Sequence, residues 1–94
     1  MMRVVWTPLA ENDFLATISF IAQDNPIQAR RIGGVLREAA ASLSLFPQRG
    51  RPGLIEDTRE LVLPSLPWRL VYDIRGDNIR ILRLLHGAQD WPPR

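Results

Sequence analysis

The chain has 94 residues, of which 46% are hydrophobic, and these values predict one globular domain over residues 1–94 and argue against disorder. It has no cysteine and a single histidine, which excludes disulfides, thiolate metal sites and multi-histidine metal sites. No segment resembles a signal peptide or reaches the length of a membrane span, so we expect a cytoplasmic protein without metal or cofactor. All twelve basic residues are arginine, and the net charge is only +2.

The first half of the chain predicts a strand and two helices. Residues 3–6 (RVVW) predict a short strand, and Thr7-Pro8 is typical of an N-cap followed by proline in the first helical turn. Helical spacing extends to about residue 23, and Asn25-Pro26 then starts a second helix antiparallel to the first. Gly33-Gly34 predicts close packing of that helix against the sheet or a partner. Its predicted core stripe is Ala29, Ile32, Leu36, Ala39, Leu43 and Phe46.

The second half predicts an antiparallel meander. Pro47 ends the second helix, and residues 48–57 form a loop rich in glycine and arginine. Strands are predicted over residues 58–63, 68–75 and 78–85, with a hairpin turn at Gly76-Asp77. The fold class predicted is α+β in the order β-α-α-β-β-β, a helical hairpin packed on a small, mainly antiparallel sheet. Alternation places Trp68, Leu70, Tyr72 and Ile74 on one sheet face and Arg69, Val71, Asp73 and Arg75 on the other, which is solvated or covered by a partner.

Six segments resemble the toxins of the ParE/RelE superfamily, the type II toxin–antitoxin toxins also described as plasmid stabilisation toxins. In chain order they are VVWTPLAENDF, IAQDNPIQA, FPQRGRPG, TRELVL, PWRLVYDI and ILRLLHGAQDWP. The resemblance implies a cognate antitoxin, ParD-like or another small DNA-binding protein, that holds the toxin inactive in a hetero-oligomer. It also implies that the antitoxin folds onto the toxin as it binds, on the helical hairpin or the open sheet face.

The resemblance implies one of two activities, because ParE-like members poison DNA gyrase and RelE-like members cut messenger RNA on the ribosome. RNA cleavage needs proton-transfer groups and cations for the phosphate, which RelE-like members supply with lysines, arginines and a late tyrosine. This chain has no lysine, Pro64 aligns with a catalytic arginine, and Trp91 lies in the region of the tyrosine. We therefore favour a ParE-like gyrase inhibitor that arrests growth by binding rather than by catalysis. The alternatives are a RelE-like ribosome-dependent endoribonuclease and a non-toxic member retained for antitoxin binding.

No catalytic residue is favoured, and whether the chain is an enzyme stays open. If it is a nuclease, the candidates are His86, Arg83 and Arg69, because histidine transfers protons near neutral pH and arginine binds phosphate. The alternative is structural: His86 in a turn, and Arg69 paired across strands with Glu60 or Asp73.

Other residues are candidates for binding the target or the antitoxin. They are Arg30, Arg31 and Arg37 on the second helix, Arg49 and Arg51 in the loop, and Trp91. Alternatively, these arginines form a solvated helix face and a solvated loop, and Arg59 pairs with Asp73. Trp91 either packs on the sheet with the C-terminal tail or is an exposed anchor, since tryptophan is frequent at binding hot spots. The aromatic residues expected in the core are Trp6, Trp68 and Tyr72.

Overall fold

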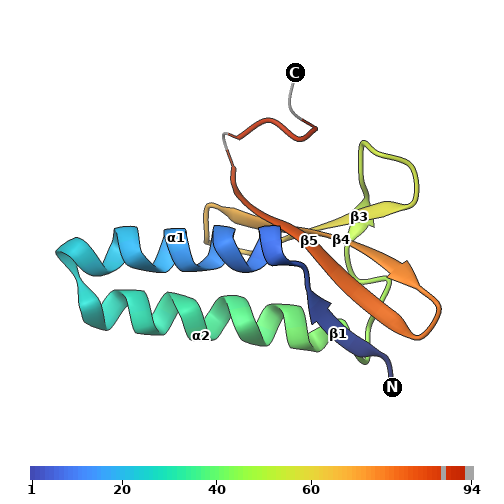
Figure 1. Cartoon of the computed structure of the whole chain (residues 1–94), viewed down its shortest axis with the longest axis horizontal. Helices are drawn as coiled ribbons and strands as arrows, with labels where there is room; N and C mark the ends of the chain where they lie inside the picture. The colour runs from blue at the N-terminus through green and yellow to red at the C-terminus, as the bar shows by residue number, and fades with distance from the viewer. Residues whose placement is uncertain (88, 93–94) are drawn as a thin grey trace.

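The computed structural model describes residues 1–87 and 89–92 and consists of a helical hairpin on a five-stranded sheet (Figure 1). The hairpin comprises α1 (Pro8–Asp24) and α2 (Pro26–Ser42). The strands are β1 (Arg3–Trp6), β2 (Arg51–Pro52), β3 (Thr58–Val62), β4 (Trp68–Arg75) and β5 (Asn78–His86), in the sheet order β1-β5-β4-β3-β2. β1 runs parallel to β5, and the other three pairs are antiparallel. The predicted α+β fold is confirmed.

Both helices begin at the predicted caps. The Thr7 hydroxyl accepts a hydrogen bond from the amide of Ala10 at 3.2 Å, and Asn25 Oδ1 accepts one from the amide of Gln28 at 3.0 Å. Each cap satisfies a backbone donor that the helix itself leaves without a partner. Because Asn25 also ends α1, the two helices run back along each other with no intervening loop.

Two predictions about the segment after α2 are wrong. The helix ends at Ser42 instead of continuing to Pro47, so Phe46 falls outside the stripe and is 61% exposed. The chain turns early here because Ser44 is held by Met2, the residue before β1: its carbonyl accepts a hydrogen bond from the Met2 amide at 3.1 Å. The predicted loop over residues 48–57 also contains β2, whose two residues pair with β3 at the edge of the sheet.

The core lies between the hairpin and the sheet. Tyr72 is its largest fully buried side chain, and Trp6 and Trp68 are half-buried against it. The Tyr72 hydroxyl donates to the Pro47 carbonyl and accepts from the Gly50 amide, both at 2.8 Å. Burial raises the pKa of Tyr72 above its ordinary value, so the phenol stays protonated as these two bonds require. Its hydroxyl thus ties the loop after α2 to the middle of the sheet.

The second sheet face, which the hairpin does not cover, is only partly open. Val71 and Leu85 on this face are 0% and 1% exposed, although no helix packs over them. Their register neighbours on this face include Glu60, Arg69 and Arg83, and Arg69 also donates hydrogen bonds to the backbone at the end of β5 and after it. Ile74, predicted on the core face, is 36% exposed because it lies close to the β4–β5 turn.

Of the glycine pair of α2, Gly33 lies at the contact between the two helices instead of against the sheet, whereas Gly34 is exposed. A Cβ added at Gly33 would lie 3.4 Å from Ile18 Cδ1 and 3.5 Å from Phe14 Cζ, both on α1. A Cβ added at Gly34 would meet nothing within 4 Å.

Gly34→Ala is therefore expected to stabilise the protein by about 0.5–1 kcal/mol, because alanine is the better helix residue and no neighbour resists it. For a domain of this size, that gain corresponds to a rise of roughly 3–6 °C in the thermal midpoint. Gly33→Ala is the matched control and should stabilise the protein less, because the Ile18 side chain must move to make room for the methyl group. A lower midpoint for Gly34→Ala would contradict the open space at this position.

Candidate functional site

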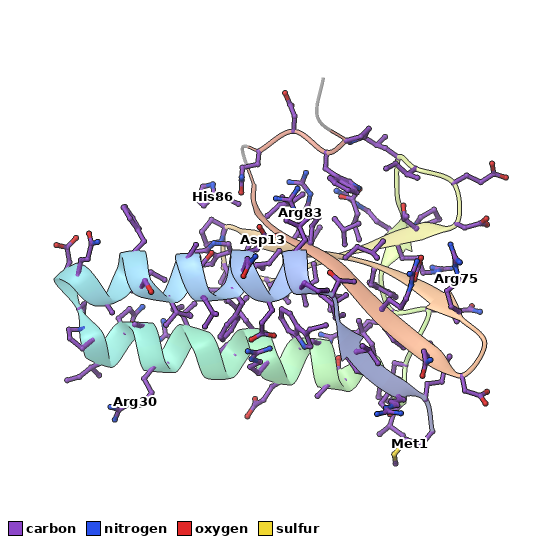
Figure 2. All side chains as sticks on the ribbon, viewed as in Figure 1. Met1, Asp13, Arg30, Arg75, Arg83 and His86 are labelled. Carbon is purple, nitrogen blue, oxygen red and sulfur yellow. The ribbon has the colours of Figure 1, made fainter. Side chains whose placement is uncertain are left out.

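Arg83 and Arg69, two of the candidate nuclease residues, share the second sheet face. Arg83 points to Asp13 of α1, as Figure 2 shows, with Nε and Nη2 donating to the two carboxylate oxygens at 2.7 and 3.1 Å. Asp13 also accepts the Leu84 amide at 3.0 Å. These hydrogen bonds raise the pKa of Arg83 above its ordinary value. Both side chains are less than one-fifth exposed, so the pair joins α1 to β5 and leaves little of the guanidinium for a ligand.

Arg69 is engaged by the protein on all sides. Its Nε lies 3.0 Å from Glu60 Oε1, an ion pair without hydrogen-bond geometry, which confirms the predicted partner on β3. Its Nη atoms donate to the carbonyls of His86, Gly87 and Gln89 at 3.4, 3.3 and 3.0 Å. A planar guanidinium can serve several acceptors at once. Arg69 therefore fixes the backbone that follows β5.

His86 lies on the other sheet face from these arginines. Cross-strand partners in an antiparallel pair project to the same side, and His86 is opposite Trp68, whereas Arg83 is opposite Val71. The His86 ring packs edge-on against the Trp68 ring at 6.0 Å between centroids. Figure 2 shows His86 apart from the Arg83–Asp13 pair. The three candidates thus do not converge on one point where an RNA phosphate and its 2′-hydroxyl could lie.

The predicted pairing of Arg59 with Asp73 is wrong. Arg59 instead donates to the Gly50 carbonyl at 2.6 Å, because it projects toward the loop after α2. Asp73 is 5% exposed and receives Arg80, whose Nε and Nη2 donate at 2.9 and 2.6 Å. Arg75 lies on the outer side of the same carboxylate at 3.6 Å. The hydrogen bonds from Arg80 to Asp73 raise the pKa of Arg80 above its ordinary value.

The helix arginines differ from one another. Arg30 and Arg31 are exposed, as a solvated or partner-binding face requires. Arg37 is not part of that face, which corrects the grouping of the three. Its guanidinium pairs with Glu11 and stacks on the Phe14 ring at 3.8 Å. Arg37 therefore holds the two helices together.

The loop arginines border an apolar depression. Arg49 is exposed and donates to the Ser42 hydroxyl at 2.8 Å. Phe46, Pro47 and Gln48 line the depression together with these two residues. Arg51 lies in β2, with its side chain 68% exposed and 3.9 Å from Glu60. Both arginines remain available to a partner on their outer side.

Trp91 is half-buried and packs back toward the sheet. The Arg83 guanidinium lies 5.6 Å from the centre of its ring, and its buried Nε1 has no hydrogen-bond partner among the described residues. This position corresponds to the packed tail rather than to the exposed anchor. Ala88, Pro93 and Arg94 lie outside the described residues.

One carboxylate of this site was missed. Glu60 was predicted as a cross-strand partner of Arg69, because a charged residue of β3 lies beside Arg69 on the next strand. Asp13 was not predicted, because 70 residues separate it from Arg83 and only the packing of α1 on β5 brings them together. Within residues 1–87 and 89–92, no three metal-ligating side chains cluster, and neither helix is long and apolar enough to cross a membrane.

Comparisons with known proteins agree with this architecture. The family model described as the ParE toxin of the type II toxin–antitoxin system parDE matches residues 4–91. Over 90 residues the chain is 37% identical to Y4kP of Sinorhizobium fredii, a protein named as a candidate toxin, covering 96% of this chain and 93% of that one. Toxin RelE2 of Caulobacter vibrioides is 36% identical over 89 residues, covering 95% and 99%.

A solved structure extends the likeness to three dimensions. The structure entitled chromosomal ParDE TA system from P. aeruginosa contains a chain that superposes with a TM-score of 0.82 and 26% identity, covering 92% of this chain and 96% of that one. The family of this chain is assigned from the match of the family model over nearly the whole chain together with this superposition. The protein belongs to the ParE toxin family, within the ParE/RelE superfamily of type II toxin–antitoxin toxins.

Proposed function

We propose that this toxin arrests growth by binding DNA gyrase in the cytoplasm and is neutralised by a cognate antitoxin. The observation that supports this proposal most strongly is that the candidate nuclease residues are already bound within the protein or lie apart from one another. Arg83 is bound to Asp13, Arg69 to Glu60 and three backbone carbonyls, and His86 lies on the opposite sheet face. An arginine that is already paired with a carboxylate of the protein is poorly placed to bind the phosphate in the transition state.

The antitoxin part of the proposal rests on exposed surfaces. The structure from P. aeruginosa is entitled a ParDE system, so that toxin is paired with a ParD protein. In this chain, Leu15 and Phe20 of α1 are 54% and 71% exposed. A second apolar surface is the depression after α2, which Phe46 lines. Exposed apolar side chains of this size are suited to a partner that folds onto them.

A second candidate is a ribosome-dependent endoribonuclease, because two relatives carry the name RelE. These are RelE2 and RelE1 of Caulobacter vibrioides, the latter 30% identical over 82 residues. In that case the proton-transfer group would be His86, which is exposed at the end of β5. The two candidates differ in whether growth arrest needs this imidazole.

His86→Gln is expected to leave growth arrest within about twofold of the unchanged protein, because gyrase binding requires no proton transfer at this position. A general acid or base contributes a factor of about 10²–10⁴, so an endoribonuclease would lose nearly all its toxicity. Induced growth curves measure the difference. Thermal unfolding and antitoxin affinity serve as controls for the fold. Loss of toxicity with both controls unchanged would favour the endoribonuclease.

A further inference from the structure

The second sheet face carries a surplus of positive charge. Strand pairing places six arginines on it, as counted among the described residues: Arg3, Arg51, Arg69, Arg75, Arg80 and Arg83. Three carboxylates pair with them: Glu60 and Asp73 from the sheet and Asp13 from α1. Six arginines against three carboxylates leave a surplus of three positive charges, whereas the whole chain carries +2. An anionic partner is therefore attracted to this face rather than to the protein as a whole.

The carboxylates divide these arginines into a fixed and an available set. Arg69, Arg80 and Arg83 are the fixed set, each within 3.0 Å of a carboxylate. The side chains of Arg75 and Arg51 are 70% and 68% exposed and lie 3.6 and 3.9 Å from carboxylates that already have a closer partner. Arg3 is exposed as well. The available arginines thus keep most of their donors toward solvent.

The strand register gives the spacing of the available arginines. Arg3 and Arg75 are both register partners of Asn78, so two strand spacings, about 10 Å, separate them. Arg51 is joined through Glu60 to Val71, which precedes Arg75 by four residues on β4. Two strand spacings across the sheet and four residues along it place Arg51 about 16 Å from Arg75 and about 24 Å from Arg3.

This spacing is close to that of the phosphates in duplex DNA. The minor and major grooves of B-form DNA are about 6 and 12 Å wide, so the phosphorus atoms on their two sides are about 12 and 18 Å apart once the phosphate radii are added. The steps between the available arginines are about 10 and 16 Å. The long arginine side chains cover the remaining difference, so all three guanidinium groups can reach a phosphate of one duplex.

We propose that this face binds the phosphate backbone of duplex DNA, with Arg3 and Arg75 on the two sides of the minor groove and Arg51 across the adjoining major groove. Guanidinium groups bind phosphate through pairs of parallel hydrogen bonds. The face already contains a contact of this kind, in which Nε and Nη2 of Arg80 donate to the two carboxylate oxygens of Asp73.

The surroundings of the available arginines favour a nucleic acid over a protein partner. Among the described residues, the exposed apolar side chains of this face are Val5 and Val62, and the register places both off the path that joins the three arginines. Protein partners are held by buried aromatic and apolar contacts at the centre of an interface, whereas a phosphate backbone needs only donors and positive charge. The proposal does not depend on gyrase, because the duplex alone is the ligand.

A fluorescently labelled duplex of about 16 base pairs is the probe, since the three arginines span only about seven base-pair steps. Anisotropy is measured as the full-length protein is added at several salt concentrations. Three phosphate contacts predict a slope of about −2.7 when the logarithm of the association constant is plotted against that of the salt concentration. No binding at low salt, or a slope shallower than about −1, would overturn the proposal.

Two double variants give a matched comparison, because each removes two exposed arginines and brings the net charge from +2 to zero. Arg51→Gln with Arg75→Gln is expected to weaken duplex binding about tenfold or more at low salt and to reduce the slope by about 1.8. Arg30→Gln with Arg31→Gln, on α2, should leave the slope unchanged. Equal effects of the two double variants would show that only net charge matters, which would contradict a defined site.

The first double variant is expected to fold, because Glu60 and Asp73 keep Arg69 and Arg80 as partners, and thermal unfolding checks this. Arg3→Gln alone, on the edge strand β1, is an independent variant and should reduce the slope by about 0.9. An unchanged slope would remove Arg3 from the site and, with it, the match to the minor groove.

Two further ligands of equal charge test the kind of partner. Single-stranded DNA should bind the protein more weakly than the duplex, because a flexible strand does not hold its phosphates at fixed groove spacings. A glutamate peptide should also bind more weakly, because the path between the arginines offers no apolar anchor. Binding of either ligand as tight as that of the duplex, and lost in the variant of Arg51 and Arg75, would overturn the assignment to duplex DNA.

Discussion

Gly50→Ala is expected to destabilise the protein by about 3 kcal/mol, the largest effect that we expect from adding one methyl group. An added Cβ would lie 2.8 Å from both Cε1 and the hydroxyl of Tyr72, and 3.0 Å from the backbone of Glu60. Neither neighbour can yield, since the Tyr72 ring is fully buried and Glu60 lies in β3. Moving the loop away would break the bond from the Gly50 amide to Tyr72. Urea unfolding at equilibrium measures the change.

The control for this effect is Gly34→Ala, which adds the same methyl group where nothing lies within 4 Å. A second variant, Tyr72→Phe, removes the hydroxyl and its two hydrogen bonds and should cost about 1–2 kcal/mol. Because the added methyl and the hydroxyl compete for one space, the double variant should cost less than the two single changes together. Unchanged stability of Gly50→Ala would contradict the close contact between the loop and Tyr72.

Asp13→Ala is expected to lower the free energy of unfolding by about 2 kcal/mol. The change removes both acceptors of Arg83 and the acceptor of the Leu84 amide. Breaking a fully buried ion pair is more costly, but Arg83 is 19% exposed and can recover part of its hydration. Thermal and urea unfolding measure the loss.

The neighbouring exposed residue provides the control, since Asn12→Ala should change stability by no more than about 0.5 kcal/mol. A double-mutant cycle with Arg83→Ala isolates the pair, and we expect a coupling of about 1–2 kcal/mol. If Asp13→Ala and Asn12→Ala behave alike, Asp13 does not hold α1 on β5. The cycle also indicates whether Arg83 is free for a ligand, because a strongly coupled arginine is not.

The sequence predicted those parts of the fold that depend on local chemistry. Thr7-Pro8 and Asn25-Pro26 mark helix starts wherever they occur, because a side-chain oxygen and a fixed proline φ act within one turn. The bounds of β4 followed in the same way from its alternating side chains. Phe46 was misplaced because helical spacing continues past Ser42 in the sequence, whereas the chain leaves the helix there and Ser44 bonds to Met2 before β1.

The candidate site was less predictable, because its side chains meet through long-range packing. The contact of Arg69 with Glu60 followed from strand order, but its bonds to the carbonyls after β5 depend on where the chain turns back. By spacing alone Arg37 looked like a surface residue, yet it hydrogen-bonds to Glu11 and stacks on the Phe14 ring, both on α1. No local pattern distinguishes such an arginine from a solvated one.

The most direct test of the proposed activity is supercoiling of relaxed plasmid by purified gyrase in the presence of the folded toxin. We expect inhibition that rises with toxin concentration, together with an increase in cleaved DNA held by gyrase, and recovery of supercoiling when the antitoxin is added. The toxin's antitoxin affinity, measured on the same preparation, is the control for its integrity. Full supercoiling at saturating toxin, with antitoxin binding intact, would contradict the gyrase proposal.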